Sequence, residues 1–410
     1  MSSRLFVAIS ALLLSIAVLL QGCIACNGRE QGETPQPEHV QADHIQADWE
    51  FTIISVGDIM IHDAQLRAGW DAATKTHDFS FMFEHVAPIL READLVIGNL
   101  ETPLAGKDNN GYSGYPMFNA PEILAKNLKD AGFTLVSTAN NHMRDRKFRG
   151  VCTTLDHLDA AGLLHAGSFR TREAQEAILI TSVKGVRIGV IGATYSDTKV
   201  LPVPEFALYY IDEERLLADI KKVRQDGAQY AILMLHWGDE YKAKPNQAQT
   251  RLAKTLLEGG ADLILGNHPH VLQRGETVLL PNEERASGKD QMRFVMYSHG
   301  NFVANQIEME TLTSILLKLT IGVDGATGEP YFKSAGYFPI YTQRRNTQGG
   351  YRHTIWPLEL ALDKLRAGGK VFNSVDRANI PKAWDHVLKS LPELELLMLP
   401  EDFGRDVSAE

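Results

Sequence analysis

The chain has 410 residues, of which 22% are charged and 44% hydrophobic, and its formal net charge is −10 at pH 7. This composition is that of an ordinary soluble globule. The acidic balance excludes nucleic acid binding through a broad basic surface, so an anionic substrate would have to be held by a local group of residues.

The N-terminal segment predicts export. Arg4 precedes an apolar run over residues 5–20 that is too short to span a bilayer as a mature helix and is typical of a signal peptide. The run ends in Leu20-Gln21-Gly22-Cys23, which resembles a bacterial lipoprotein box, where cleavage precedes a cysteine that carries acyl chains. We expect removal of residues 1–22 and attachment of Cys23 to a bacterial membrane, on its periplasmic or extracellular face. Ordinary secretion and a retained helix are the alternatives.

A polar tether follows the signal peptide. Residues 23–48 are rich in Gln, Glu, Pro and Ala and contain almost no apolar cluster, so they cannot offset the entropy of ordering. Residues 49–345 are expected to form the main domain. Residues 346–410 are expected to pack on it as a C-terminal extension, with helical spacing from Pro381 to Leu399.

Short apolar or β-branched runs form the framework of the main domain, and each gives way abruptly to polar residues. These runs cover residues 51–56, 94–97, 134–136, 230–235, 262–265 and 294–297. Helix-like amphipathic stretches lie between them, at residues 120–131, 151–161, 213–225 and 246–258. This alternation predicts mainly parallel sheets that are buried on both faces. A hairpin-like pair of strands after Phe302 would extend one sheet.

The polar residues after these runs predict a single binding crevice. The carboxyl ends of parallel strands lie along one edge of a sheet, where ligands bind. The residues that would meet there form the oxygen and imidazole set that Zn, Mn or Fe ions prefer, and they are Asp58, Glu101, Asn141, His142, His236, His268 and His270. Any one of them alone could instead cap the backbone of its own loop. Several such clusters at equivalent positions favour a metal site.

The segment His268-Pro269-His270 gives a geometric expectation. Its histidines are two positions apart, so an extended segment would direct both imidazoles to the same side, and proline favours that geometry. One ion or a close pair could accept both. A pair about 3.5–4 Å apart usually needs a bridging carboxylate, for which Glu101 and Asp58 are the candidates.

Ordered motifs between about Ile53 and Phe302 are more specific than any single residue, and they read VGDIM, GNLETPL, ANNHMRD, LHWGDEY, LGNHPHV and YSHGNF. They resemble the motifs of the bacterial CapA, or PgsA, proteins of poly-γ-glutamate capsule synthesis. That family is similar to calcineurin-like metallophosphoesterases. The resemblance implies an α/β fold, a four-layer αββα sandwich of two mixed sheets, with a pair of divalent ions (Mn, Fe or Zn).

The resemblance also implies roles for the matching residues. The ion-binding positions fall on Asp58 and His270 for one ion, on Asn141, His236 and His268 for the other, and on Glu101 as the bridge. His142 would stand beside the ions as a proton donor to a leaving group or as a hydrogen-bonding clamp on the substrate. Asp145, three residues later, would orient the His142 imidazole.

Further residues are expected to contact the substrate, namely His62, Arg144, Glu240 and Asn301. Phosphoesterases usually carry Asp-x-His in the first motif, and this histidine is absent after Asp58. His62 could substitute for it, and a plain loop residue is the alternative. Arg144 belongs to the basic run of residues 143–149, which is either a solvated helix face or a clamp for a polyanion.

Two functions from different classes agree with these observations. The first is a metal-dependent hydrolase of the bacterial envelope that acts on a phosphoester or on an anionic polymer such as poly-γ-glutamate. The second is a non-catalytic subunit of a membrane assembly for polymer synthesis and export, with other capsule-synthesis membrane proteins as partners. The missing histidine favours the second function, and the retained His142 and Asp145 favour the first.

Overall fold

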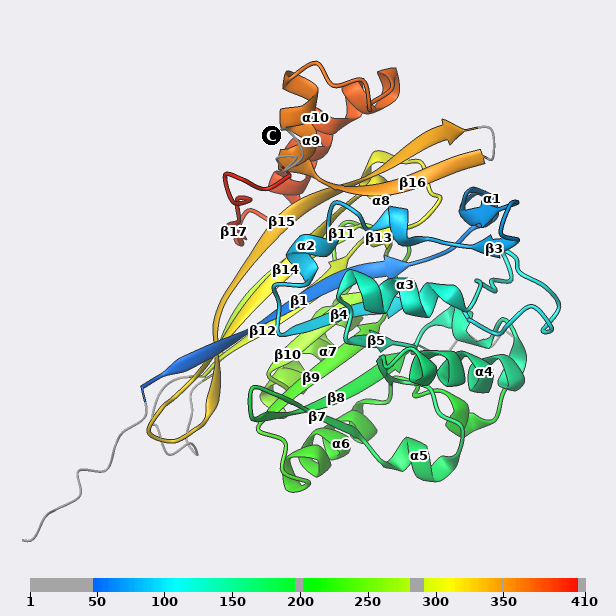
Figure 1. Cartoon of the computed structure of the whole chain (residues 1–410). Coiled ribbons are helices and arrows are strands. Elements are labelled where there is room, and N and C mark those ends of the chain that lie inside the picture. The colour runs from blue at the N-terminus through cyan, green and yellow to red at the C-terminus, as the bar shows by residue number, and fades with distance from the viewer. Residues whose placement is uncertain (1–46, 196–201, 281–290, 348–349, 405–410) are drawn as a thin grey trace, which may run out of the picture. The chain divides into compact units, whose positions relative to one another are not determined.

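The computed structural model describes residues 47–195, 202–280, 291–347 and 350–404, all within the larger of two units, residues 45–410 (Figure 1). The expected signal peptide, Cys23 and nearly all of the expected tether fall in residues 1–46, outside the described residues. No helix in the described part of the chain is both long enough and apolar enough to cross a membrane.

The larger sheet has nine strands and is parallel on one side of β1 and mainly antiparallel on the other. Strands β1, β4, β5 and β6 are parallel neighbours, and β14, β15 and β16 continue from β1 in antiparallel pairs. The order across the sheet is β16 (Gly350–Pro357), β15 (Pro330–Thr347), β14 (Thr313–Val323), β1 (Trp49–Ile59), β4 (Leu95–Leu100), β5 (Leu135–Ser137) and β6 (Leu164–Ala166). Two short strands complete it, β13 (Asn301–Val303) beside β1 and β17 (Glu395–Leu396) beside β15.

The smaller sheet has six strands with a parallel centre. Its order is β11 (Leu272–Leu280), β12 (Gln291–His299), β10 (Leu263–Asn267), β9 (Tyr230–His236), β8 (Val186–Thr194) and β7 (Leu179–Val183). The outermost strands, β11 and β7, pair antiparallel with their neighbours. A separate two-stranded hairpin consists of β2 (Trp70–Asp71) and β3 (Thr76–His77).

The two sheets pack against each other, and helices cover their outer faces (Figure 1). Alternate residues of a strand point to opposite faces, so Phe51 and Ile53 of β1 join the core between the sheets, which also contains Ile232 of β9. The intervening Ile54 and Val56 belong to a second core on the outer face of the larger sheet. The described helices are α1 (Asp63–Gly69), α2 (Ala87–Leu90), α3 (Ile123–Ala131), α4 (Lys147–Ala160), α5 (Arg172–Glu176), α6 (Glu213–Gln225), α7 (Gln247–Glu258), α8 (Met309–Leu312), α9 (Leu358–Arg366) and α10 (Ser374–Ser390). Helices α3 and α4 pack in the second core, and α6 and α7 cover the smaller sheet.

These layers confirm the expected αββα sandwich of two mixed sheets. Each apolar run in the sequence overlaps a strand, and the predicted helical stretches overlap α3, α4, α6 and α7, with differences of up to four residues at their ends. The larger sheet combines both kinds of pairing, because the pairs from β1 through β14 and β15 to β16 are antiparallel, whereas β1, β4, β5 and β6 are parallel.

The C-terminal part departs from expectation in two places. Helix α10 begins at Ser374, because the Asn373 side chain accepts hydrogen bonds from two backbone N–H groups of its first turn, and it ends at Ser390. Pro381 therefore lies inside the helix and does not begin it. The expected boundary between residues 345 and 346 falls inside β15, which continues to Thr347 and pairs with β16.

Strands β1 and β13 approach each other closely at their ends. A Cβ atom on Gly57 would lie only 1.8 Å from the carbonyl oxygen of Gly300. The N–H of Asp58 donates to this same oxygen at 3.0 Å, and Asp58 is the partner of Asn301 in the parallel pairing. A residue without a Cβ at position 57 therefore places Asp58 beside Asn301.

We expect Gly57→Ala to push β1 away from β13 and to lower the free energy of unfolding by about 2 kcal/mol or more, because the added methyl group overpacks the contact. Chemical denaturation of residues 49–410 measures this loss. Gly185→Ala is the control, because its Cβ would meet nothing within 4 Å. It should lose only about 1 kcal/mol, the cost of a side chain at a positive φ. Equal losses in the two variants would contradict the close-contact explanation.

Candidate metal centre

Polar side chains from both sheets meet at the carboxyl ends of the parallel strands. Asp58 lies at the end of β1, Glu101 directly follows β4, and His236 ends β9. His268 and His270 follow β10 directly. All of these side chains are buried. The structure thus brings together residues that are up to 212 positions apart in the sequence.

Ligand atoms in this cluster form overlapping groups. Three sets each place their atoms within 4.8 Å of one another, and they are Glu101 with His236 and His268, Asp58 with Glu101 and His270, and Glu240 with His268 and His270. Glu101 belongs to the first two sets. The Oδ1 atom of Asn141 lies 2.9 Å from Nε2 of His236, so the amide expected as a ligand lies beside the first set.

Asn99 connects the acidic and imidazole parts of the cluster. Its Nδ2 donates to Asp58 Oδ1 at 2.7 Å and to Glu101 Oε2 at 3.4 Å, and it lies 3.3 Å from His236 Nδ1. Asn140 in turn donates from Nδ2 to Asn99 Oδ1 at 3.3 Å. These contacts orient the carboxylates that would face an ion.

The backbone turns at both histidines that follow β10. His268 has φ +100° and His270 has φ +59°, and residues 268–271 form bends. The expectation of an extended segment is therefore wrong. The two imidazole centroids are nevertheless 5.9 Å apart, because the turns direct both rings toward the cluster. Such backbone conformations are costly for residues other than glycine and are concentrated at functional sites.

The buried carboxylates favour positive charge between them. Burial raises the pKa of Asp58, but the hydrogen bond and the charge of His270 outweigh it and lower that pKa to about 2. Burial and the neighbouring Asp58 charge raise the pKa of Glu101 well above its ordinary value. Burial lowers the pKa of His270, yet Glu101 and Asp58 together raise it to about 9. A divalent cation would satisfy the same electrostatic demand.

The remaining imidazoles are suited to bind such a cation. Burial lowers the pKa of His236 to about 3 and that of His268 to about 2, so both rings are neutral, as metal ligands must be. Nδ1 of His268 and Oε1 of Glu101 are buried and have no hydrogen-bond partner among the described residues. Buried polar atoms are nearly always paired. Nitrogen and oxygen atoms that lack hydrogen-bond partners, inside a set of carboxylates and imidazoles, are suited to bind a divalent ion.

His142 and Asp145 form a pair beside the cluster. Nδ1 of His142 lies 2.8 Å from Oδ2 of Asp145, which also accepts a hydrogen bond of 2.7 Å from the Phe118 N–H. The Phe118 ring packs edge-on against His142, with centroids 4.6 Å apart. Burial lowers the pKa of His142, but Asp145 outweighs it and the net pKa is raised. The contact with Asp145 is therefore placed to orient the imidazole.

Two residues expected to contact substrate have other partners. Nδ1 of His62 accepts a hydrogen bond of 3.3 Å from the Asn305 N–H, and His62 is not in any of the three ligand sets of the described chain. Arg144 is buried, and its Nη1 donates to the Tyr210 hydroxyl at 3.2 Å.

The other two residues expected to contact substrate lie in or beside the ligand sets. Glu240 is exposed and belongs to the set with His268 and His270. Oδ1 of Asn301 lies 3.1 Å from Nδ1 of His270, and its Nδ2 donates to Gln306 Oε1 at 2.6 Å. Asn301 thus holds the His270 ring.

The basic run of residues 143–149 is divided between the interior and the surface. Arg146 is buried and donates from Nη2 to the Met117 carbonyl at 2.9 Å and from Nε to the Phe118 carbonyl at 3.1 Å. Lys147 and Arg149 are exposed. A solvated helix face is therefore the wrong interpretation for Arg144 and Arg146, which instead hold neighbouring loops.

Sequence reasoning missed the hydrogen-bonding asparagines and one ring. Asn99 and Asn140 stand inside the motifs GNLETPL and ANNHMRD, close to the expected ligands Glu101 and Asn141, so their position in a motif is the signal that could identify them. Tyr195 packs on His268 with centroids 4.7 Å apart. No motif pointed to it.

One cavity adjoins the cluster and another does not. A recess of about 650 Å³ is lined in part by Gln306, Thr311 and Tyr241, and the Tyr241 ring lies 5.8 Å from that of His270. A second cavity, of about 380 Å³, lies between β6, β8 and α5.

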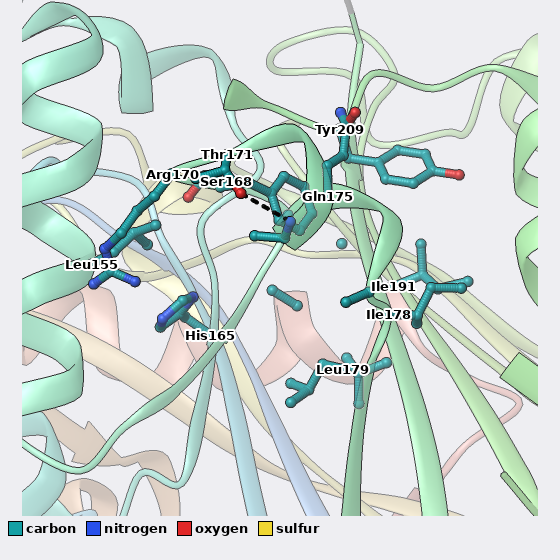
Figure 2. A pocket seen from close by; sticks show the side chains of 17 residues that line it. Leu155, His165, Ser168, Arg170, Thr171, Gln175, Ile178, Leu179, Ile191 and Tyr209 are labelled. Atoms are coloured by element: carbon teal, nitrogen blue, oxygen red, sulfur yellow. Dashed lines mark hydrogen bonds between the residues drawn. The ribbon is translucent and has the colours of Figure 1, made fainter. Parts of the chain in front are cut away.

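Figure 2 shows the second cavity, with Ile178 and Ile191 on one side and Arg170 on the other. Arg170 is paired with Asp156 and Asp159, so we assign no chemistry to this cavity.

Comparisons with known proteins identify relatives of this chain. The model of the family described as "Bacterial capsule synthesis protein PGA_cap" matches residues 52–306. "Capsule biosynthesis protein CapA" of Bacillus anthracis is 30% identical over 288 residues, which are 67% of this chain and 65% of that protein. "PGA biosynthesis protein CapA" of Bacillus subtilis is 29% identical over 308 residues, 72% of each chain. The chain thus spans slightly less than two thirds of the length of the first of these relatives.

Solved structures with a related arrangement include two bacterial enzymes. The NAD nucleotidase of Haemophilus influenzae aligns with a TM-score of 0.43 and 14% identity over 86% of this chain and 57% of that chain. The calcineurin-like phosphoesterase YfkN of Bacillus subtilis aligns with a TM-score of 0.39 and 14% identity over 84% and 98%. Both TM-scores lie below 0.5, so the fold is assigned from the strand order and layers of this chain itself.

We expect Asn99→Ala to weaken divalent-ion binding by about 10–100-fold, the usual effect of removing a residue that orients a ligand. Titration of residues 49–410 against a chelating dye measures the affinity. Asn127→Ala is the matched control, since Asn127 is also buried and hydrogen-bonded, to Phe79 and Asp78. A similar loss of affinity in both variants would mean that Asn99 acts only through stability.

Proposed function

The chain belongs to the bacterial capsule synthesis protein (PGA_cap) family, and we propose that it is a metal-dependent, hydrolase-like protein of poly-γ-glutamate synthesis or processing. The observation that carries this proposal is Glu101, which is shared by two sets of ligand atoms. A carboxylate in that position is what a pair of ions with a common ligand requires. The names of the Bacillus relatives, which refer to capsule and PGA biosynthesis, support the choice of polymer.

The proposed ion sites follow the two sets that share Glu101. One ion would be held by Asp58 and His270, the other by Asn141, His236 and His268, with Glu101 between them. Mn, Fe or Zn suits these oxygen and imidazole ligands. Such ions lower the pKa of a bound water and draw charge from a phosphoryl or carbonyl oxygen.

The residues beside the ions would handle protons and substrate. Nδ1 of His142 is engaged by Asp145 at 2.8 Å, so Nε2 is the nitrogen left to give a proton to a leaving group. The Phe118 ring, packed against His142, limits the approach of water from that side. Glu240 is exposed beside His268 and His270, where it would contact either an ion or the substrate.

A specific observation favours a second candidate function, a non-catalytic subunit of a membrane assembly for polymer synthesis or export. The histidine usual after the first aspartate is absent, and His62 lies outside the ligand sets of the described residues. In that case the ions would hold polymer or stabilise the fold, and no substrate would be turned over.

Replacing His142 and His268 separately by Ala distinguishes these roles. The unmodified body, residues 49–410, should carry between one and two Mn, Fe or Zn ions per chain by elemental analysis. His268→Ala should lose ions and turnover together, because it removes a ligand. His142→Ala should keep its ions while turnover of a panel of phosphoesters and γ-glutamyl polymer falls by roughly 10²–10⁴.

Other outcomes of this experiment would change the assignment. An equal loss of ions in both variants would make His142 a ligand. Full ion content without turnover of any substrate, even in the unmodified protein, would favour the assembly subunit. A body that stays free of metal after reconstitution would overturn the metal centre.

We further propose that Cys23 carries the lipid that attaches the protein to the bacterial envelope, as the sequence Leu20-Gln21-Gly22-Cys23 suggests. Cys23→Ser should leave an unprocessed precursor or a form released from membranes, which fractionation and acyl labelling measure. Cys26→Ser, three residues away in the same segment, is the control and should remain attached. Retention of the label in Cys23→Ser would contradict the anchor.

A further inference from the structure

A groove lined by lysines lies on the helical side of the larger sheet. It has a volume of about 890 Å³ and runs between the β2–β3 hairpin, the loop after β4, and helices α3 and α4. In Figure 1 these elements lie close together, with α3 between β3 and α4. The charged residues of its lining are four lysines, Lys75, Lys107, Lys126 and Lys129, and two carboxylates, Glu122 and Asp130.

The lining of this groove is basic in a chain whose net charge is −10. Four lysines stand against two carboxylates. Both carboxylates are engaged within the groove, Asp130 by Lys126 at 2.5 Å and Glu122 by the Tyr112 hydroxyl at 2.7 Å. Lys75 and Lys107 are exposed and form no ion pair within the described ranges. Their positive charges are therefore available to an anionic ligand.

Packed rings form one wall of the groove. The His77 ring lies between Trp70, at a centroid distance of 5.0 Å, and Tyr112, at 5.4 Å. Trp70 remains 45% exposed. A wall of contacting rings is already ordered before a ligand binds, so less entropy is lost on binding.

One loop lines both the groove and the metal centre. Residues 102–122 connect Glu101 to α3. Lys107 and Tyr112 of this loop face the groove, whereas Phe118 packs against His142. A chain-like ligand could follow this loop from the groove to the ions.

We propose that the groove is a second binding site for a polycarboxylate chain, and that it holds a segment of the polymer away from the bond at the metal centre. This inference rests on the proposed function, because it assigns the class of substrate that the same site receives. A concave groove suits a linear chain better than a flat anionic membrane. Lysines act as point charges that accept repeated carboxylates without a fixed geometry, and several weak contacts along one chain add up to useful affinity.

The test reverses the charges of the unpaired lysines. Lys75→Glu and Lys107→Glu are combined in residues 49–410, and the binding of fluorescently labelled poly-γ-glutamate is followed by anisotropy at several salt concentrations. Each exposed charge pair contributes modestly, so the double reversal should weaken binding by roughly tenfold and reduce its salt dependence. Lys221→Glu with Lys382→Glu is the matched control, because both are exposed, lie outside the groove and change the net charge equally. The control should bind within about twofold of the unmodified protein.

The outcomes separate this site from the metal centre. His268→Ala should keep the part of polymer binding that depends on the groove. The double lysine variant should show weaker polymer binding even if no preparation shows turnover. If turnover occurs, the lysine variant should have a raised KM for long polymer and an unchanged kcat for a short γ-glutamyl peptide. Equal binding by the lysine variant and its control would overturn the groove. Loss of binding to phosphatidylglycerol vesicles, with polymer binding unchanged, would assign the surface to a membrane and would also overturn it.

Discussion

The candidate metal centre depends on two carboxylates, Asp58 and Glu101, that are fully buried near each other. Two like charges in a region of low dielectric repel strongly and lose their hydration, so the surroundings must supply positive charge or protons. The raised pKa of Glu101 and that of His270, about 9, both express this demand. The amide of Asn99 satisfies one oxygen on each carboxylate. The imidazole of His270 and the amide of Asn99 thus lie where they offset the negative charge of the two carboxylates.

The two sheets contribute different chemistry to the cluster. The larger sheet and the segments that follow its strands supply the carboxylates and amides, Asp58, Asn99, Glu101, Asn141 and Asn301. The smaller sheet supplies the imidazoles, His236, His268 and His270, and the exposed carboxylate of Glu240. Each of the two ligand sets that share Glu101 combines residues from both sheets. These two sets therefore form only when the apolar core between the sheets has brought their carboxyl ends together.

The sequence predicts the strands and the cluster of polar residues well, but it predicts the backbone turns and the side-chain partners at the site poorly. Apolar runs that end in polar residues place a strand and its loop reliably, because burial on both faces requires a continuous apolar strand. Residue spacing alone does not specify φ, so the turns at His268 and His270 could not be foreseen. Arg146 appears as part of a charged surface run in the sequence, yet its guanidinium donates to the carbonyl groups of Met117 and Phe118, which are 28 or 29 positions away in the sequence. Such partners depend on tertiary contacts that a linear pattern does not contain.

The division of ligands between the sheets links folding to ion supply. An ion bound at the cluster would contact residues of both sheets, so its binding free energy would also hold the sheets together. A ligand that binds only the folded state stabilises it by about 2.7 kcal/mol at a free concentration one hundred times its dissociation constant. The export that we propose would expose the protein to ion concentrations set by the surroundings and not by the cytosol. The lifetime of the folded protein outside the cell would then report the availability of its metal, and scarcity would remove the protein itself as well as its activity.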